Sequence, residues 1–371
     1  MDPPSDAGRL TPRERRWLIG IAVVYAAVVI PIGIRKGGDF TQELTQSERL
    51  LRGLPLYAAN PEGGIWWPPF TALGLVPFAL MARWSLALAK AAWAALNVFA
   101  LGWTVARTRA WTTGWTPVVL ALAAVGKPLQ SNYEHLNLTP ILLALIVAAA
   151  ADLDARRDGR AGWWIGLATA IKGFPALLLV YVAYRGRWRA CGTGLAVAGG
   201  LTVGAMLPLG PAASVAAVHD WVRLSNQGAV VTRWGTQSLQ GLGVFYRWPT
   251  GAVLAIGLAC LAIAIAALRR PTASPGALAD VGLVTVLAVL LSPIAWLYYY
   301  TLAFPAWVAT LARPTRRPPW LRGLLLIAGA LTSGVLTFDL YPRALSAMAA
   351  ANYTWGGLAL LAALVIDRRR D

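Results

Sequence analysis

Long apolar segments recur along almost the whole chain and are separated by short polar or basic connections. About 12 of them can be delimited, at 17–34, 66–82, 85–106, 114–127, 138–151, 161–184, 190–208, 249–268, 276–291, 295–311, 320–337 and 350–367. A helix of about 20 apolar residues crosses the hydrocarbon core of a bilayer. The pattern therefore predicts an all-α polytopic membrane protein with about 12 transmembrane helices.

The composition supports a membrane protein and excludes a separate soluble domain. Of the 371 residues, 57% are hydrophobic and 13% are charged, and the mean hydropathy is +0.57. Soluble domains carry about 25% charged residues, and no stretch of such composition is long enough to fold alone. We predict a single transmembrane domain at 17–367, between a cytoplasmic segment at 1–16 and a cytoplasmic tail at 368–371.

The net charge of +17, from 33 Lys and Arg against 16 Asp and Glu, indicates orientation in the membrane and not a nucleic-acid partner. Arg residues fall between the apolar segments, as the positive-inside rule expects. Basic residues at both ends, with an even number of spans, predict that both termini are cytoplasmic. The two longest loops, 35–65 and 209–248, then lie outside. The same alternation places 83–84 and 128–137 on the cytoplasmic side.

Three apolar segments are short or broken, which predicts a polar cavity at membrane depth. The segments 114–127 and 138–151 would each span only about 21 Å as helices. The segment 161–184 is interrupted by Lys172-Gly173-Phe174-Pro175. A charged Lys inside a span is costly unless it faces a partner or a water-filled cavity. No internal repeat is evident, which weakens a transporter built from inverted repeats.

Asp39 is the acidic residue with the clearest candidate role. It follows two glycines just after the first apolar segment. The next stretch, 41–57, has the pattern of an amphipathic helix lying at the membrane interface. Asp39 therefore either caps this helix, as a structural residue, or serves as a general base at the outer mouth of the cavity. Four other carboxylates sit beside Arg clusters and are predicted to be solvated loop charges: Asp152, Asp154, Asp158 and Asp367.

The remaining polar groups give no metal site. Glu134 and His135 lie in a polar stretch between two short apolar segments, but adjacent residues point apart on a helix. The chain has two histidines and two cysteines, with no ligand cluster around them. We therefore predict no metal and no cofactor.

The outer loop 209–248 combines amide and hydroxyl groups with interleaved tryptophans. Such surfaces suit a sugar, which needs hydrogen bonds at its edge and stacking at its face. Arg233 could hold a phosphate. An ordinary interfacial loop remains the alternative, as belt aromatics do for the tyrosines that follow Ser292-Pro293.

Taken in order, the motifs resemble one family. They are Gly53 to Tyr57 ("Gly-x-Pro-x-Tyr"), Trp67 to Phe70 ("Trp-Pro-Pro-Phe"), Glu134 to Leu138 ("x-x-Leu-Asn-Leu"), Gly166 to Pro175, Arg185 to Arg189, Gln237 to Gly241 and Leu291 to Trp296. The chain resembles glycosyltransferase family 87, the polyprenyl-phosphate-mannose-dependent α-mannosyltransferases with a GT-C type fold. The resemblance extends from about residue 35 to 311.

The resemblance implies a reaction. A hexose, most readily mannose, would pass from a polyprenyl-phosphate donor to a lipid or glycan acceptor with inversion, at the outer face of the cell membrane. Asp39 occupies the position of the general base, and Lys172 and Arg233 are candidates for holding the donor phosphate. No metal is needed. The positions implied to contact substrate are Tyr57, Glu134, His135, Asn137, Gln237, Ser238, Trp296, Tyr298 and Tyr299.

Several positions depart from the family pattern. Glu134-His135 stands where the family usually has Gly-Gln, Thr236 where it has Asn, and Tyr298-Tyr299 where it often has His. These departures leave the sugar and the acceptor open. A transporter or lipid-linked-sugar flippase is the alternative function, and a non-catalytic scaffold subunit is a third. An enzyme is favoured because intramembrane charges are few and polar groups gather in the outer loops.

Overall fold

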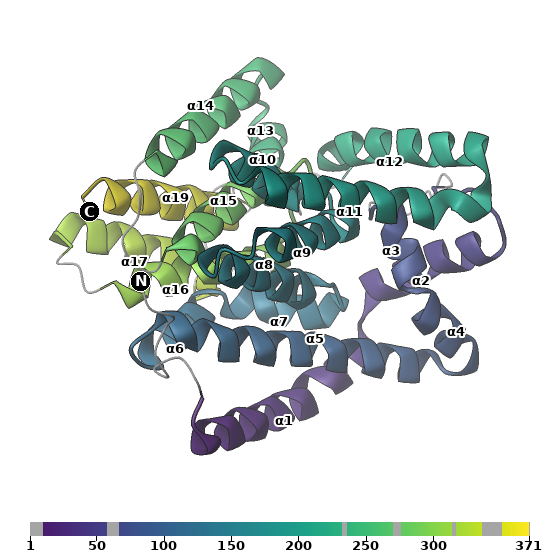
Figure 1. The fold of residues 1–371 in the computed structure, drawn as a ribbon, viewed down its shortest axis with the longest axis horizontal. Helices are drawn as coiled ribbons and strands as arrows, with labels where there is room; N and C mark the ends of the chain where they lie inside the picture. The colour runs from purple at the N-terminus through teal and green to yellow at the C-terminus, as the bar shows by residue number, and fades with distance from the viewer. Residues whose placement is uncertain are drawn as a thin grey trace. The chain divides into compact units, whose positions relative to one another are not determined.

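The computed structural model describes residues 10–57, 67–231, 236–269, 276–313, 317–335 and 351–370 (Figure 1). Within these ranges every regular element is a helix, which confirms the all-α prediction. Among the described residues, four stretches are helical, long and apolar enough to span a membrane. They are α1 (Pro12–Arg35), α5 with its 3-10 extension (Leu86–Trp111), α11 with its 3-10 extension (Trp188–Leu209) and α14 (Thr250–Leu268). The protein is therefore a multi-pass membrane protein.

The helices form two compact units, each assembled from separate parts of the chain. The Asp39 unit comprises Tyr25–Val98 and Asn132–Thr232, and the Gln237 unit comprises Met1–Val24, Phe99–Ser131 and Arg233–Asp371. The Asp39 unit contains α2 (Gly38–Leu51), α3 (Pro69–Gly74), α4 (Val76–Trp84), α8 (Thr139–Asp154), α9 (Asp158–Ile171), α10 (Leu177–Tyr184), α11 (Trp188–Met206) and α12 (Pro211–Val231). Parts of α1, of α5 (Leu86–Thr108) and of α7 (Gly126–His135) complete it.

The predicted span 161–184 is a helical hairpin, and the prediction of one crossing is wrong. After α9 the chain turns through a short 3-10 helix (Phe174–Ala176) and returns as α10. Arg187, just beyond α10, bonds both the Leu153 carbonyl at 2.7 Å and Asp158 at 2.9 Å. Both ends of the hairpin therefore lie together. Pro175 cannot continue a helix, so the interruption read from the sequence forms the hairpin tip.

Close helix packing fixes the orientation of this hairpin. Gly162 and Gly166 of α9 lie against the backbone of α11 at Ala190 and Gly194, where any side chain on either glycine would collide. The helices α9 and α11 thus run side by side in the same direction (Figure 1). Lys172, at the tip, is therefore remote from the basic turn before α11.

The predicted span 66–82 is likewise not one helix. It divides at Leu75 into α3 and α4, where Pro77 removes a helical hydrogen bond. Both ends of this pair contact α2. Gln46 approaches the Trp67 carbonyl at 3.5 Å, and Arg83 binds Glu48 at 2.7 Å. Residues 83–84 therefore lie at the same end of the unit as α2. The alternation of spans predicts the opposite end for them and is wrong here.

Three further contacts show which ends of α1 and α5 lie together. Lys90, early in α5, donates to the Ile34 carbonyl at 3.3 Å. Glu14, early in α1, pairs with Arg109 at 3.7 Å and accepts the Trp115 indole N–H at 2.9 Å. The chain after α5 therefore lies beside the start of α1.

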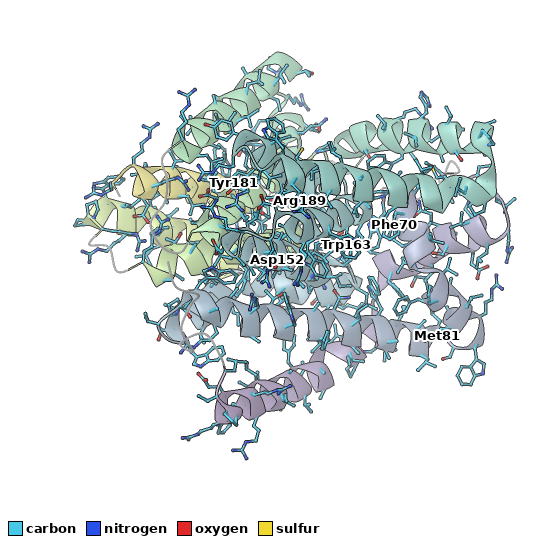
Figure 2. All side chains as sticks on the ribbon, in the orientation of Figure 1. Phe70, Met81, Asp152, Trp163, Tyr181 and Arg189 are labelled. Carbon is cyan, nitrogen blue, oxygen red and sulfur yellow. The ribbon has the colours of Figure 1, made fainter. Side chains whose placement is uncertain are left out.

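Two carboxylates that the sequence predicts to be solvated are buried in ion pairs. Asp152, near the end of α8, is 3% exposed and binds Arg157 at 2.8 Å (Asp152 is labelled in Figure 2). In the Gln237 unit, Asp367 binds Arg317 at 2.7 Å and is also 3% exposed. These two carboxylates are buried and paired, so the prediction of solvated loop charges is wrong for them.

The Gln237 unit packs its helices around α15 (Ala277–Leu291), which is buried along almost its whole length. Its other elements are α6 (Thr116–Ala124), α13 (Leu239–Tyr246), α14, a 3-10 helix (Leu297–Ala303), α16 (Phe304–Ala312), α17 (Pro319–Ser333) and α19 (Asn352–Arg370). Helix α19 contacts α14, α15 and α17. An ion pair between Asp280 of α15 and Arg368 of α19 is almost fully buried and fastens the two helices.

Candidate functional site

Asp39 lies in the first turn of α2, where the exposed backbone N–H groups of a helix favour a negative charge. The chain enters this turn through Gly37, whose φ of +32° favours glycine. A side chain there would meet the Gly33 carbonyl at 2.5 Å and a Leu136 methyl group at 2.7 Å. The sharp connection between α1 and α2 therefore depends on Gly37 and sets the position of Asp39.

Asn137 orients the Asp39 carboxylate. The Asn137 amide Nδ2 donates to Asp39 Oδ2 at 3.0 Å, and its Oδ1 accepts the Leu138 backbone N–H at 2.9 Å. The second bond fixes which end of the amide faces Asp39. Asn137 is fully buried. The predicted site residues Asp39 and Asn137 are therefore brought together, although sequence alternation predicts opposite membrane sides for their segments.

A strained leucine holds Asn137 in place. Leu136 has a φ of +53°, which is costly for a residue with a branched side chain. Its side chain is fully buried against Gly33 and Gly37, and its carbonyl accepts the Trp93 indole N–H at 2.9 Å. Packing thus fixes the turn after α7, and strain of this kind gathers at functional sites.

Lys172, at the hairpin tip, is buried beside the same helix. Its Nζ lies 4.9 Å from the centre of the Trp67 ring, within the range of a cation–π contact. Only 8% of the residue is exposed. The negative charges that act on it belong to Glu43 and Asp39, with Glu43 the stronger. The structure therefore groups Lys172 electrostatically with the Asp39 carboxylate.

Glu43 is the site residue that sequence reasoning missed. It follows Asp39 by four residues, so the two carboxylates share one face of α2. Glu43 is 5% exposed, and its Oε2 makes no hydrogen bond within the described part of the chain. Burial raises the pKa of Glu43 well above its usual range, Lys172 opposes this rise and Asp39 adds to it. The spacing of four residues between Asp39 and Glu43 was the sequence signal that could have found it.

Hydrogen bonds tie the segment around Trp67 to α2 and to the hairpin tip. The Tyr57 hydroxyl donates to the Trp67 carbonyl at 2.6 Å. Thr71 Oγ1 donates to the Ile171 carbonyl at 2.9 Å, which joins α3 to the residue before Lys172. Tyr57 is thus beside the site with its hydroxyl used within the protein, and its role toward substrate stays a prediction.

Helix α12 covers this region and was not predicted within the outer loop 209–248. The Trp221 ring lies against Gly173, where an added side chain would meet it at 3.1 Å. Trp221 and Ala217 also pack in one apolar cluster with Leu50 and Tyr57. The cluster shields the hairpin tip and the end of α2 from one side.

The other predicted residues of the polar stretch lie at its edge. Glu134, on α7, forms an ion pair with Lys36 at 3.5 Å. His135 is exposed. Of this stretch, Asn137 contacts Asp39.

The remaining predicted substrate contacts belong to the Gln237 unit and have clear structural partners. Gln237 Oε1 accepts the Tyr353 backbone N–H at 3.2 Å, and Ser238 caps α13 by accepting the Gly241 N–H at 3.2 Å. Tyr298 and Tyr299 are buried with their rings edge to face, and Trp296 is half-buried. Arg233 lies outside the described residues. The roles of these residues toward substrate stay predictions.

No group of three or more His, Cys, Asp or Glu side chains in the described ranges could hold a metal ion. The site instead offers two carboxylates, an amide and an ammonium group around one helix start. Such a set can take a proton from a hydroxyl and can stabilise an anionic leaving group.

Comparison with known proteins identifies the family of this chain. Residues 66–293, more than half of the chain, match glycosyltransferase family 87. The chain is also similar to an alpha-(1->3)-arabinofuranosyltransferase of Corynebacterium glutamicum, with 25% identity over 343 residues that cover 80% of this chain and 75% of the relative. No solved structure matches. The family match includes Asn137 and Lys172 and begins after Asp39 and Glu43.

Proposed function

Because this chain belongs to glycosyltransferase family 87, we propose that it transfers a sugar from a polyprenyl-phosphate donor to an acceptor hydroxyl, with Asp39 as the general base. The observation that carries the proposal is the Asp39 carboxylate, held at 3.0 Å by the buried Asn137 and accompanied by the buried Lys172. The base can take the proton of the acceptor hydroxyl, and the cation can stabilise the negative charge of the leaving phosphate.

The reaction needs one proton acceptor and one source of positive charge. The acceptor oxygen attacks the anomeric carbon from the face opposite the phosphate while its proton passes to an Asp39 oxygen. The bond between the anomeric carbon and the phosphate oxygen breaks, and the polyprenyl phosphate leaves with the electron pair. The configuration inverts. Lys172 stabilises the leaving phosphate electrostatically, and Arg233 is a second candidate for this role.

The sugar is the open part of the proposal. The resemblance in the motifs favours a hexose, mannose, and a lipid or glycan acceptor. The name of the corynebacterial relative favours arabinofuranose, a pentose. We propose mannose as the first donor to test and arabinofuranose as the second.

We further propose that the Asp39 end of its unit faces the outside of the cell membrane and that both termini are cytoplasmic. The opposite end of that unit carries Arg156, Arg157 and Arg160 before and within the start of α9, and Arg185, Arg187 and Arg189 before and within the start of α11. The positive-inside rule favours this end for the cytoplasm. The single-domain boundaries at 17–367 and a GT-C type arrangement of the helices belong to the same proposal.

The test is transfer by the purified protein in lipid nanodiscs. Radiolabelled polyprenyl-phosphate mannose and polyprenyl-phosphate arabinofuranose are supplied with lipid and glycan acceptors. Asp39→Asn should lower the rate at least about 100-fold, because the base is lost. Glu48→Asn on the same helix, whose side chain is partly exposed and pairs with Arg83, should leave it close to wild type.

Three outcomes count against the proposal. Transfer by Asp39→Asn at the wild-type rate shows that Asp39 is not the base. If the wild type uses neither donor, the proposed donor class is wrong. Movement of the lipid-linked sugar across a bilayer without transfer would support the flippase alternative.

A further inference from the structure

The Gln237 unit buries a group of charged side chains between α15, α16 and α19 whose charges do not balance. The group consists of Asp280, Arg313, Arg317, Asp367 and Arg368, and none of these side chains is more than 11% exposed. Three guanidinium groups stand against two carboxylates, which leaves one net positive charge within the described residues of the group. A buried charge is costly unless an opposite charge accompanies it.

The geometry assigns most of the excess charge to Arg313. Arg317 Nε and Nη2 donate to the two oxygens of Asp367 at 2.9 and 2.7 Å. Arg313 shares the same carboxylate, but its Nη1 lies 3.9 Å from Asp367 Oδ2, which is beyond hydrogen-bond distance. Asp280 is engaged by Arg368. Arg313 is therefore the guanidinium group with the weakest counter-charge among the three.

Arg313 and Arg368 both line a small cavity of about 10 Å³, which is room for about one water-sized particle. The other lining residues are Ala279, Leu283, Ala309, Thr310 and Leu364. The Thr310 hydroxyl donates to the Ala306 carbonyl at 2.8 Å. Among the described residues that line the cavity none is acidic, so the polar groups facing it are chiefly guanidinium N–H donors. Arg313 Nε is buried and makes no hydrogen bond in the described part of the chain.

Size and charge together select the ligand of this cavity. A water molecule has the right size but does not supply the missing negative charge. A sulfate, a phosphate or a lipid headgroup supplies the charge but is too large for the space. A halide ion is little larger than water, carries one negative charge and accepts charge-assisted hydrogen bonds from several N–H groups.

We propose that the cavity binds one chloride ion between Arg313 and Arg368. The ion completes a set of three positive and three negative charges and links the end of α16 to the end of α19. The site lies in the Gln237 unit, and the inference is independent of the proposed sugar transfer. A ligand that binds only the folded protein stabilises it. The stability of the protein should therefore depend on chloride itself and not only on ionic strength.

The experiment measures the binding of radiolabelled chloride to the full-length protein in phosphatidylcholine nanodiscs. Potassium gluconate replaces potassium chloride and keeps the ionic strength constant. Melting temperatures are measured in parallel in chloride, bromide, sulfate and gluconate. The variants are Arg313→Met, which removes the excess charge and keeps a long side chain, Arg313→Lys, and the control Arg370→Met at an exposed position of α19.

The wild type should bind one chloride ion per chain, and bromide should compete for it while sulfate and gluconate should not. Its melting temperature should be about 2–4 °C higher in saturating chloride than in gluconate. Arg313→Met should bind no chloride. Because its remaining buried charges balance, it should melt in gluconate at or above the temperature of the wild type. Arg313→Lys should bind chloride more weakly, and Arg370→Met should follow the wild type.

The wild type alone can overturn the inference, so the result does not depend on how well a variant folds. Failure to bind chloride in a saturable manner overturns it, and so does a melting temperature that is the same in chloride and in gluconate. Chloride binding that persists unchanged in Arg313→Met shows that the ion binds elsewhere, and the assigned site is then wrong. A loss of chloride binding in Arg370→Met equal to that in Arg313→Met would likewise exclude a specific role for the cavity.

Discussion

Asn137 Nδ2 donates a hydrogen bond of 3.0 Å to Asp39 Oδ2 and so joins residues that are 98 positions apart. The amide is fixed from behind by the Leu138 N–H and by the bond from the Asn137 N–H to the Asn132 carbonyl at 3.0 Å. A base whose carboxylate is held by a rigid donor starts the reaction in a defined orientation. Asn137 is thus a positioning residue for Asp39.

Replacing Asn137 by Ala should lower kcat about tenfold or more, because a misplaced catalytic group loses much of its advantage. The donor KM should change much less, since Lys172 remains. Initial rates at varied donor concentration separate the two parameters. Thr45→Ala, at an exposed position of α2, the helix that carries Asp39, serves as the control. A wild-type kcat in Asn137→Ala would show that the hydrogen bond is dispensable.

Two neighbouring glycines provide a matched test of the backbone before Asp39. Gly37→Ala should destabilise the fold by about 1–3 kcal/mol, because alanine is strained at positive φ and its methyl group meets Gly33 and Leu136. Gly38→Ala should be nearly neutral, since nothing lies within 4 Å of the added carbon. Thermal unfolding in detergent compares the two. Equal melting temperatures would contradict the proposed requirement for glycine at position 37.

The apolar pattern predicted most helix positions well, because burial in lipid and helix length leave a strong signal in sequence. The breaks at Lys172 to Pro175 and the amphipathic helix near 41–57 were also visible, although α2 ends earlier, at Leu51. What failed was the alternation of sides. Counting assumes that each apolar segment crosses, and the segments 66–82 and 161–184 turn back on themselves.

The site was predicted in part for the same reason. Asp39, Asn137 and Lys172 were selected by local context and motif, and tertiary folding then brought them together. Glu43 escaped notice because a carboxylate on an amphipathic helix is usually solvated, and its burial depends on α3, α4 and the hairpin tip. Contacts of this kind join residues as far as 100 positions apart, as Thr71 and Ile171 illustrate.

Single cysteines can test the proposed orientation. Trp84→Cys should be labelled by an impermeant maleimide from outside, and Ala155→Cys only after the membrane is opened. Both positions are exposed in the structure. Simple alternation predicts the reverse for each. The background is Cys191→Ser with Cys260→Ser, and Thr45→Cys on α2 and Arg185→Cys mark the two sides. The reverse labelling at 84 and 155 would refute the orientation.

The ion pair between Asp280 and Arg368 should matter for stability. Both residues are 3% exposed, and Arg368 Nε also donates to the Ala267 carbonyl at 2.7 Å. Asp280→Asn leaves a buried guanidinium without its counter-charge, which should cost about 3–5 kcal/mol. The control Asp220→Asn breaks the more exposed pair with Arg223 and should cost about 1 kcal/mol or less. Denaturation in mild detergent measures the free energy of unfolding of both variants. Equal losses of stability would argue against a special role for the Asp280–Arg368 pair.

Glu43 should also make stability depend on pH, with a sign that follows from its burial. Burial raises the folded-state pKa of Glu43 above its ordinary value of 4.5. Between these two pKa values the folded protein binds more protons than the unfolded chain, so this residue lowers the free energy of unfolding as the pH rises. The loss amounts to about 1.4 kcal/mol per pH unit within that window.

Glu43→Gln removes this dependence, so its melting temperature should exceed that of the wild type at pH 8 and should approach it near pH 5. Glu48→Gln, at a partly exposed carboxylate, should show no such divergence. If Glu43→Gln melts below the wild type at pH 8, Glu43 is ionised and stabilising in the fold, and burial does not control its pKa.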